Sequence, residues 1–489
     1  MNIICAYPVN VDAVCNIRSE EISALIPSNM KIELKESIGS REDLLSSLLF
    51  CMQQGSGAEI LIQGPEVARQ IEQSFSWQFR LGGNAGIMAN VLAVLGAKPV
   101  LNAPALGAKL ASMLHAGVRV TVSGMLMEPG KAAGELEADQ EMVHFVFQFK
   151  KGDLIASGQS RIIASSDNRF IATYDPVNTR LLSSRYFDSY CLENIREIDG
   201  ALLSGFHLAP FKEYQEIFPQ KIAQIKSWKD KNPQIFIHAE MGSFQSPEIM
   251  QSLLLLLPQI PVDSLGLNED ELAAAEGSTP GSLPVRWQET MQAAEHLRES
   301  LGLFRVAVHT RDYILSVMLP GKIAAKEELS ALQSGVDAAA ALAATGYVTG
   351  EPPQVVNPAG LEAKEEFCHN GATASGRGAF LQTGEAIISL MPSLLAKKPK
   401  ITVGLGDTAT AAVFSGNLRP LKKIGLDCGS TSPARLQVII LHLNRIHHIL
   451  RLLEPILDLL NGHALQIFSL RRLFDQLQGI QAVVKAGAV

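Results

Sequence analysis

The stretch ITVGLGDTAT, at residues 401–410, joins an apolar run to the opening of a helix. Residues 401–403 have the composition of a strand end, and the small residues and threonines around and after Asp407 favour a helix. Gly404 and Gly406, between the two, allow backbone amides to approach a ligand closely. A helix N-terminus presents unpaired N–H groups and the positive end of a dipole. The stretch therefore predicts an anion site, with Asp407 as either an N-cap or a base beside a bound phosphate.

Apolar runs of strand length recur along the chain, with periodic helical stretches between them. The runs are IICAY at 3–7, GALLSGF at 200–206, QIFIHAE at 234–240, VDSLGL at 262–267, RVAVHT at 305–310 and ITVGLG at 401–406. This alternation predicts an α/β protein with a parallel sheet flanked by helices. Ligands of such sheets bind beyond the carboxyl ends of the strands. We therefore expect the polar residues that follow the runs to gather at one edge: His238, Glu240, Asn268, Glu271, His309, Thr310 and Asp407.

Two segments depart from this alternation. Residues 118–176 contain VRVTVSGML, EMVHFVFQF and SRIIASS, which alternate or run apolar in the manner of strands. They predict a small β-rich subdomain that is inserted in the α/β domain and acts as a lid. Residues 431–489 are strongly apolar but interrupted by basic residues. They predict amphipathic helices that dock on the core, which we favour over a role at a membrane surface.

The composition narrows the class of protein. The chain has 489 residues, of which 47% are hydrophobic and 19% charged, as is usual for globular proteins. Its net charge of −7 offers no basic surface to nucleic acid. The six cysteines have no metal-ligand spacing, and the first residues lack the features of a signal peptide. We expect a cytoplasmic monomer or small homo-oligomer with no nucleic-acid and no membrane partner.

Two further carboxylates follow predicted strands, Glu240 in HAEMGS and Glu271 in LNEDEL. Gathering both near Asp407 is costly unless a cation neutralises them, and Mg²⁺ held by one or two carboxylates and by phosphate oxygens fits this need. Taken alone, Glu271 is better explained as part of an acidic helix start, whereas the three acids together favour the magnesium site. The chain has neither a GxxxxGK[ST] P-loop nor the HRD and DFG motifs of protein kinases.

A set of short motifs runs in order from about residue 3 to about residue 415: Asn10-Val11-Asp12, GAEI, RLGGNAGIMAN, HFVFQF, NRFIATYD, SGFHLA, HAE, LNEDE, VHT and GLGDTATA. This set resembles a known family, the ADP-dependent sugar kinases of archaea. These are glucokinases and phosphofructokinases of the ribokinase-like fold. The resemblance implies a three-layer α/β/α domain over residues 1–430. It also implies a lid drawn from parts of about 11–80 and 118–176, and leaves 431–489 as an unmatched helical tail.

The resemblance also implies a role for individual residues. Asp407 matches the catalytic base, and the amides of Gly404 and Gly406 belong to the anion hole. Arg169 matches an arginine that reaches toward the transferred phosphate. Glu240 and Glu271, with Asp407, match the magnesium-associated acids. The implied sugar contacts are Asp12, Glu59, Gly83, Asn84 and His144, and the implied nucleotide contacts are His309, Thr310 and Val403. Without the resemblance, His144 reads as a core histidine and Arg169 as a surface ion-pair partner.

The acceptor sugar is less sharply indicated. Glu59 matches a glutamate that binds a glucose hydroxyl in the glucokinases of this family. Met142 and Asp175 occupy two positions where strict phosphofructokinases carry cations. Other cations in or beside the lid strands can serve the phosphate of fructose 6-phosphate: Lys150, Lys151, Arg161 and Arg169. The overall motif set most resembles the methanogen branch, which includes phosphofructokinases and bifunctional enzymes.

We therefore expect an ADP-dependent 6-phosphofructokinase first and a glucokinase second, with Mg²⁺ as cofactor and ADP as phosphoryl donor. A sugar- and nucleotide-binding protein without catalysis, or an ATP-using relative, are the remaining alternatives. The presence of Asp407, Glu240, Glu271 and Arg169 argues against a pure binder.

Overall fold

A computed structural model of the protein describes residues 1–27, 30–135, 141–157, 160–244, 246–278 and 286–427. One compact unit comprises Met1–Leu421, and a second unit begins at Lys422. The predicted tail at 431–489 lies outside the described residues. No helix in the described part is long and apolar enough to cross a membrane.

A ten-stranded sheet forms the centre of the first unit, as far as it is described. The strands in spatial order are β17 (Thr373–Ser375), β18 (Gly378–Gln382), β19 (Ile387–Pro392), β16 (Tyr313–Met318), β15 (Arg305–His309), β14 (Ser264–Asn268), β13 (Phe236–Glu240), β12 (Gly200–Leu203), β1 (Asn2–Ala6) and β5 (Lys98–Leu101). The strands from β15 to β5 are mutually parallel, and β16 to β17 continue the sheet antiparallel.

Helices cover both faces of this sheet because its strands alternate buried side chains between two cores. Ile4 and Ala6 of β1 belong to one core, whereas Ile3 and Cys5 belong to the other. The first core includes side chains of α7 (Arg185–Glu193), α8 (Tyr214–Lys231), α9 (Pro247–Leu256), α10 (Glu269–Ala275), α11 (Trp287–Leu301) and α13 (Pro358–His369). On the opposite face lie α4 (Asn84–Val94), α12 (Ala325–Thr345) and α14 (Leu405–Asp427). The predicted three-layer α/β class is confirmed.

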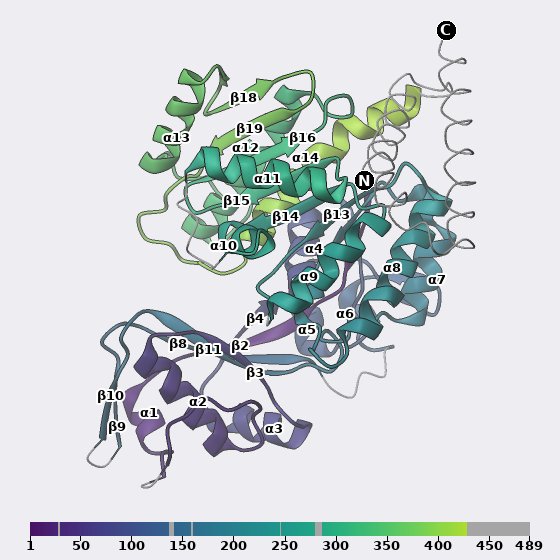
Figure 1. Ribbon diagram of the computed structural model, residues 1–489. Helices are drawn as coiled ribbons and strands as arrows, with labels where there is room; N and C mark the ends of the chain where they lie inside the picture. The colour runs from purple at the N-terminus through teal and green to yellow at the C-terminus, as the bar shows by residue number, and fades with distance from the viewer. Residues whose placement is uncertain (28–29, 136–140, 158–159, 245, 279–285, 428–489) are drawn as a thin grey trace, which may run out of the picture. The chain divides into compact units, whose positions relative to one another are not determined.

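A second sheet of five strands forms the lid (Figure 1). Its spatial order is β3 (Ala58–Leu61), β11 (Asn168–Tyr174), β8 (Val143–Phe149), β2 (Asn10–Asn16) and β4 (Gln78–Gly82). Its apolar face packs on α2 (Arg41–Gln54) and α3 (Pro65–Ser74), and α1 (Ser19–Ser23) adds Ile22 to the same core. α2 begins after Ser40, whose Oγ accepts a hydrogen bond from the Asp43 amide, and ends at left-handed Gly55, as helix caps require. The hairpin of β9 (Leu154–Ser157) and β10 (Ser160–Ile163) connects β8 to β11.

Two predicted elements differ in the structure. Residues 118–127 were placed with the lid by sequence, but β6 (Val120–Val122) and β7 (Met125–Met127) form a hairpin of their own, and Arg119 bridges to β5 of the large sheet. Residues 401–403 are not a strand. The amides of Lys400 and Ile401 donate to the carbonyl of Ala343 at the end of α12, so these two donors are not available to a neighbouring strand.

The remaining helices of the described residues are α5 (Ala108–Met113), α6 (Pro129–Ala132) and the 3₁₀ turns at Ile195–Glu197, Phe206–Leu208 and Leu257–Gln259.

Candidate functional site

A cavity of about 630 Å³ is lined by one face of the lid sheet and by residues that follow strands of the large sheet. It brings together every residue to which the family resemblance gave a catalytic, sugar, nucleotide or metal role. These residues are Asp12, Glu59, Gly83, Asn84, His144, Arg169, Glu240, Glu271, His309, Thr310, Val403, Gly404, Gly406 and Asp407. Their individual roles stay predictions, but their common placement makes this cavity the candidate site.

The lid wall follows from the two-residue period of its strands. In β2, Val11, Ala13 and Cys15 point into the apolar core of the lid, whereas Asp12 and Val14 line the cavity. The register aligns Asp12 with His144 of β8 on one side and with Arg80 of β4 on the other. One polar row therefore crosses three strands at the cavity face.

A hydrogen-bonded cluster surrounds His144. Its Nε2 lies 2.9 Å from Oδ2 of buried Asp175, and its Nδ1 lies 4.0 Å from Oε1 of Glu59. Burial disfavours the imidazolium, but the hydrogen bond to Asp175 and the nearby carboxylates outweigh that cost and raise the pKa of His144 to about 9. Thr173 Oγ1 also donates to Glu59, at 2.7 Å. His144 therefore lines the cavity with a side chain whose charged form is favoured near neutral pH, unlike an unpaired core histidine.

Asp407 lies in the first turn of α14, as the opening stretch predicted. Gly404 has a φ of +74°, and its carbonyl accepts the hydrogen bond of the Thr408 amide that opens the helix. Asn84 Nδ2 donates to Asp407 Oδ1 at 2.7 Å. Desolvation in the cavity raises the pKa of Asp407 to about 7, with the charges of Glu240 and Asp12 adding to it and the Asn84 bond opposing it. Such a carboxylate is suited to accept a proton near neutral pH.

Glu240 and Glu271 are the other two acids that we predicted to associate with magnesium, and both line the cavity. Burial raises the pKa of Glu240, and it raises the pKa of Glu271 to about 8 with the charges of Glu240 and Asp407 contributing. Glu271 also completes a capping box with Asn268, each side chain accepting from the other residue's amide at 2.9 Å. It therefore has the structural role that its position in LNEDEL suggested, and it faces the cavity as well.

The acids do not form a complete metal cage. Within the described ranges, no three His, Cys, Asp or Glu side chains lie close enough to hold a metal ion by themselves. Burial is the main cause of their raised pKa values, so a cation bound among them would stabilise their charged forms. This pattern fits Mg²⁺, which keeps water and phosphate oxygens among its ligands.

Two of the polar residues expected at the sheet edge differ from the prediction. One does not line the cavity, and the hydroxyl of the other is already hydrogen-bonded within the protein. His238 is inside β13, buried below the cavity and not on its wall. Thr310 lines the cavity, but its Oγ1 donates to the Tyr313 carbonyl and accepts from the Asp312 and Tyr313 amides, so it stabilises the β15–β16 turn. His309 faces Glu240, with Nδ1 3.6 Å from Oε1.

The cations of the cavity also differ from those expected. Lys150, Lys151 and Arg161 are exposed and do not line it, whereas Arg169 does. Sequence reasoning missed Arg80, which lies half-buried on the cavity wall beside Asp12. Desolvation and the charge of Arg169 lower the pKa of Arg80, while Asp12 opposes this. Its position in RLGGNAGIMAN, two residues before the first glycine of that motif, was the signal that the sequence offered.

Comparisons with known proteins find relatives over most of the chain. The family model described as "ADP-specific Phosphofructokinase/Glucokinase conserved region" matches residues 1–416. An ADP-dependent glucose/glucosamine kinase of Pyrococcus abyssi is 27% identical over 441 residues, which are 84% of this chain and 93% of the relative. An ADP-specific phosphofructokinase of Methanosarcina acetivorans is 26% identical over 473 residues, with 86% and 93% covered.

The fold has a close counterpart among solved structures. A hypothetical ADP-dependent phosphofructokinase from Pyrococcus horikoshii superposes with a TM-score of 0.72 at 25% identity, covering 86% of this chain and 98% of that one.

Proposed function

The chain belongs to the ADP-specific phosphofructokinase/glucokinase family, and from that premise we propose that it is an ADP-dependent 6-phosphofructokinase. The reaction transfers the β-phosphoryl group of ADP to fructose 6-phosphate, giving fructose 1,6-bisphosphate and AMP. Relatives named as ADP-specific phosphofructokinases and a solved ADP-dependent kinase complex with fructose-6-phosphate and an ADP analogue support the assignment.

The chemistry follows from the residues around Asp407. Its carboxylate takes the proton of the attacking sugar hydroxyl as the P–O bond to AMP breaks in line. The amides at the start of α14, including those of Gly404 and Gly406, face the negative charge of the phosphoryl group. Arg169 supplies a further positive charge from the lid wall. Mg²⁺ would be held by Glu240 and Glu271 together with phosphate oxygens and water, and it would neutralise the phosphates.

The choice of a phosphorylated sugar rests on one observation. Two guanidinium groups, Arg80 and Arg169, line the same lid wall, and beside desolvation the charge of Arg169 contributes to lowering the pKa of Arg80. Among the described contacts, neither side chain has a hydrogen bond that would neutralise it within the protein. A phosphate bound between them would satisfy both groups through charge-assisted hydrogen bonds.

Glucose is the second candidate, and a specific cluster favours it. Glu59 is held by Thr173 and lies beside His144, which is paired with Asp175. Carboxylates accept hydrogen bonds from sugar hydroxyls and repel phosphates. This part of the wall is therefore suited to hydroxyl groups, so phosphorylation of glucose at a lower rate is compatible with the same site.

The test is a four-way assay with Mg-ADP or Mg-ATP as donor and fructose 6-phosphate or glucose as acceptor. We expect ADP-dependent turnover of fructose 6-phosphate, reduced about 10²–10⁴-fold in Asp407→Ala because the general base is removed. Turnover of glucose alone would transfer the assignment to the glucokinase reaction. Turnover only with ATP would refute the donor, and no turnover with either donor would favour the non-catalytic alternative.

A further inference from the structure

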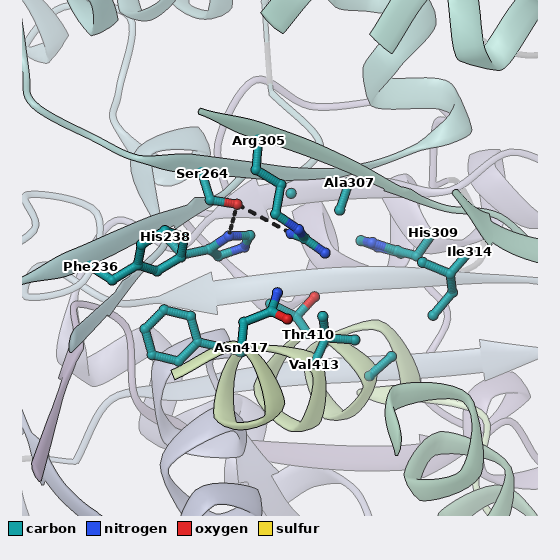
Figure 2. Close-up of a pocket in the computed structure, with 13 residues that line it drawn as sticks. Phe236, His238, Ser264, Arg305, Ala307, His309, Ile314, Thr410, Val413 and Asn417 are labelled. Atoms are coloured by element: carbon teal, nitrogen blue, oxygen red, sulfur yellow. Dashed lines mark hydrogen bonds between the residues drawn. The ribbon is translucent and has the colours of Figure 1, made fainter. Parts of the chain in front are cut away.

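A row of three polar side chains crosses the large sheet directly beneath the cavity. His238, Ser264 and Arg305 are register partners on the neighbouring parallel strands β13, β14 and β15. Figure 2 shows the two hydrogen bonds that join them, with Ser264 Oγ at the centre. All three side chains are buried between the sheet and α14. Buried polar groups of this kind require matched donors and acceptors.

The direction of the hydrogen bonds is set from the Arg305 end. A guanidinium group only donates, and Arg305 donates from Nε and Nη2 to Oε1 of buried Glu328 at 2.9 and 2.7 Å. Its Nη1 donates to Ser264 Oγ at 3.2 Å. Ser264 therefore accepts from Arg305, and its single hydroxyl proton is free to point toward His238 Nδ1, 2.9 Å away.

The hydrogen bond to Glu240 sets the tautomer of His238. Nε2 lies 2.9 Å from Oε2 of Glu240, and the ionised carboxylate that would hold a cation can only accept, so Nε2 carries a proton and donates. The Ser264 hydroxyl proton is then available to Nδ1, and a ring with its single proton on Nε2 matches both partners.

Glu240 is thereby held by one oxygen. Oε2 accepts from His238 and also from Thr410 Oγ1 of α14, at 3.1 Å. Gly266 on β14 leaves room for this arrangement, because a Cβ there would lie 2.0 Å from Oε2 and 2.7 Å from His238 Nε2. Oε1 is outside these bonds, on the side of His309, which lines the cavity.

We propose that His238 is a positioning residue, oriented by Arg305 through Ser264, which holds Glu240 so that Oε1 is presented to the magnesium–nucleotide complex. The inference rests on the proposed function, since that function supplies the magnesium–ADP ligand. Residues behind a metal-associated carboxylate commonly change metal affinity about 10–100-fold when they are replaced.

Two substitutions of His238 separate the two ends of its ring. In His238→Gln the amide nitrogen takes approximately the place of Nε2 and keeps a donor for Glu240. In His238→Asn the shorter amide takes approximately the place of Nδ1 and leaves Glu240 without that donor.

The metal affinity of each variant is measured directly. Mn²⁺ is titrated into the full-length protein with saturating ADP, and the titration is followed by electron paramagnetic resonance. We expect His238→Asn to weaken Mn²⁺ binding about 10–100-fold and His238→Gln to retain most of it, with KM for the sugar unchanged in both.

Ser264→Ala tests the orienting step, and Ser316→Ala is its matched control. Ser316 is a fully buried serine on β16 of the same sheet, and its Oγ has no hydrogen-bond partner among the described residues. We expect Ser264→Ala to weaken Mn²⁺ binding and Ser316→Ala to leave it unchanged. Thermal unfolding of each variant shows whether the fold is retained.

The tautomer gives a test that does not need catalysis or metal. In protein labelled with ¹⁵N-histidine, long-range ¹H–¹⁵N spectra distinguish the two neutral forms, and the signal absent from His238→Asn identifies the residue. We expect the Nε2–H form in the wild type. The Nδ1–H form, or wild-type Mn²⁺ affinity in a folded His238→Asn variant, would overturn the proposal even if the enzyme phosphorylates sugars.

These experiments distinguish failure of the kinase assignment from failure of the positioning role. A wild-type protein that binds Mn²⁺ with ADP but phosphorylates no sugar would refute the kinase assignment, and the binding constants would still decide the role of His238. A wild-type protein that binds no Mn²⁺ with ADP would refute the positioning role itself.

Discussion

Single residues in the lid wall acquire their chemistry from their partners. His144 is the clearest case, since a histidine in an apolar strand is neutral near pH 7 unless a neighbour stabilises its charge. Asp175 provides that neighbour, with its own carboxylate also held by Asn178. The spacing of 31 residues between His144 and Asp175 gives no local signal that they pair.

The His144–Asp175 pair predicts a pH-dependent contribution to stability. The folded-state pKa of about 9 is above the usual value of 6.5, so the stabilisation is complete below about pH 6.5 and is lost as the pH rises through about 9. We expect His144→Gln to lower the free energy of unfolding by roughly 1–3 kcal/mol near neutral pH, and by less at pH 10. Urea unfolding at pH 6, 8 and 10 measures this. His296→Gln removes an exposed pair with Glu276 and should have little effect at any of these pH values; equal losses for His144→Gln at all three pH values would contradict the prediction.

At the scale of elements, the side chains along β2, β4, β8 and β11 alternate between an apolar face and a polar face of the lid sheet. The apolar face packs on the lid helices, and the polar face lines the cavity. The period of two predicts which residues share a face, but it does not predict which strands are neighbours. Arg80 was overlooked for that reason, because only the pairing of β4 with β2 brings it beside Asp12.

The polar face predicts that Arg80 binds the phosphate of the sugar. In Arg80→Met we expect KM for fructose 6-phosphate to rise about 10–100-fold, since a charge-assisted hydrogen bond contributes about 1.5–3 kcal/mol. KM for glucose should be unchanged. Arg69→Met removes an exposed arginine of α3 that does not line the cavity and is the control. A rise in KM for ADP with both sugars would instead place Arg80 at the nucleotide phosphates.

At the scale of the whole molecule, the site belongs to one continuous unit. Every residue of the candidate site precedes Leu421, where the first compact unit ends, and the family model ends at residue 416. The relatives are covered over 93% of their length by 84–86% of this chain. The part of the chain that the family model matches therefore contains the whole candidate site.

Because the candidate site and the family match both end before residue 422, we predict that a shortened chain of residues 1–427 is active. We expect the shortened protein to keep the ADP-dependent activity and the thermal stability of the full chain, because the cavity and both sheets lie before residue 427. Steady-state kinetics and a thermal melt of the two proteins side by side measure this. Loss of soluble protein, or a raised KM for ADP, would show that the tail supports the kinase unit.

The sequence by itself indicated the α/β class, the strand-end acids, the Gly404–Asp407 helix start and the family. These features depend on local periodicity, on glycine and on short motifs, all of which are encoded by neighbouring residues. The sequence wrongly made residues 401–403 a strand, because an apolar β-branched run looks the same whether or not a partner strand is available.

Tertiary structure alone decided the row of His238, Ser264 and Arg305. Their bonds join residues 26 and 41 positions apart, and they exist only because three parallel strands align in one register. The same is true of His144 with Asp175 and of Arg80 with Asp12. Strand neighbours and register are determined by the packing of the whole sheet between its helices, so no local pattern specifies which buried polar groups will meet.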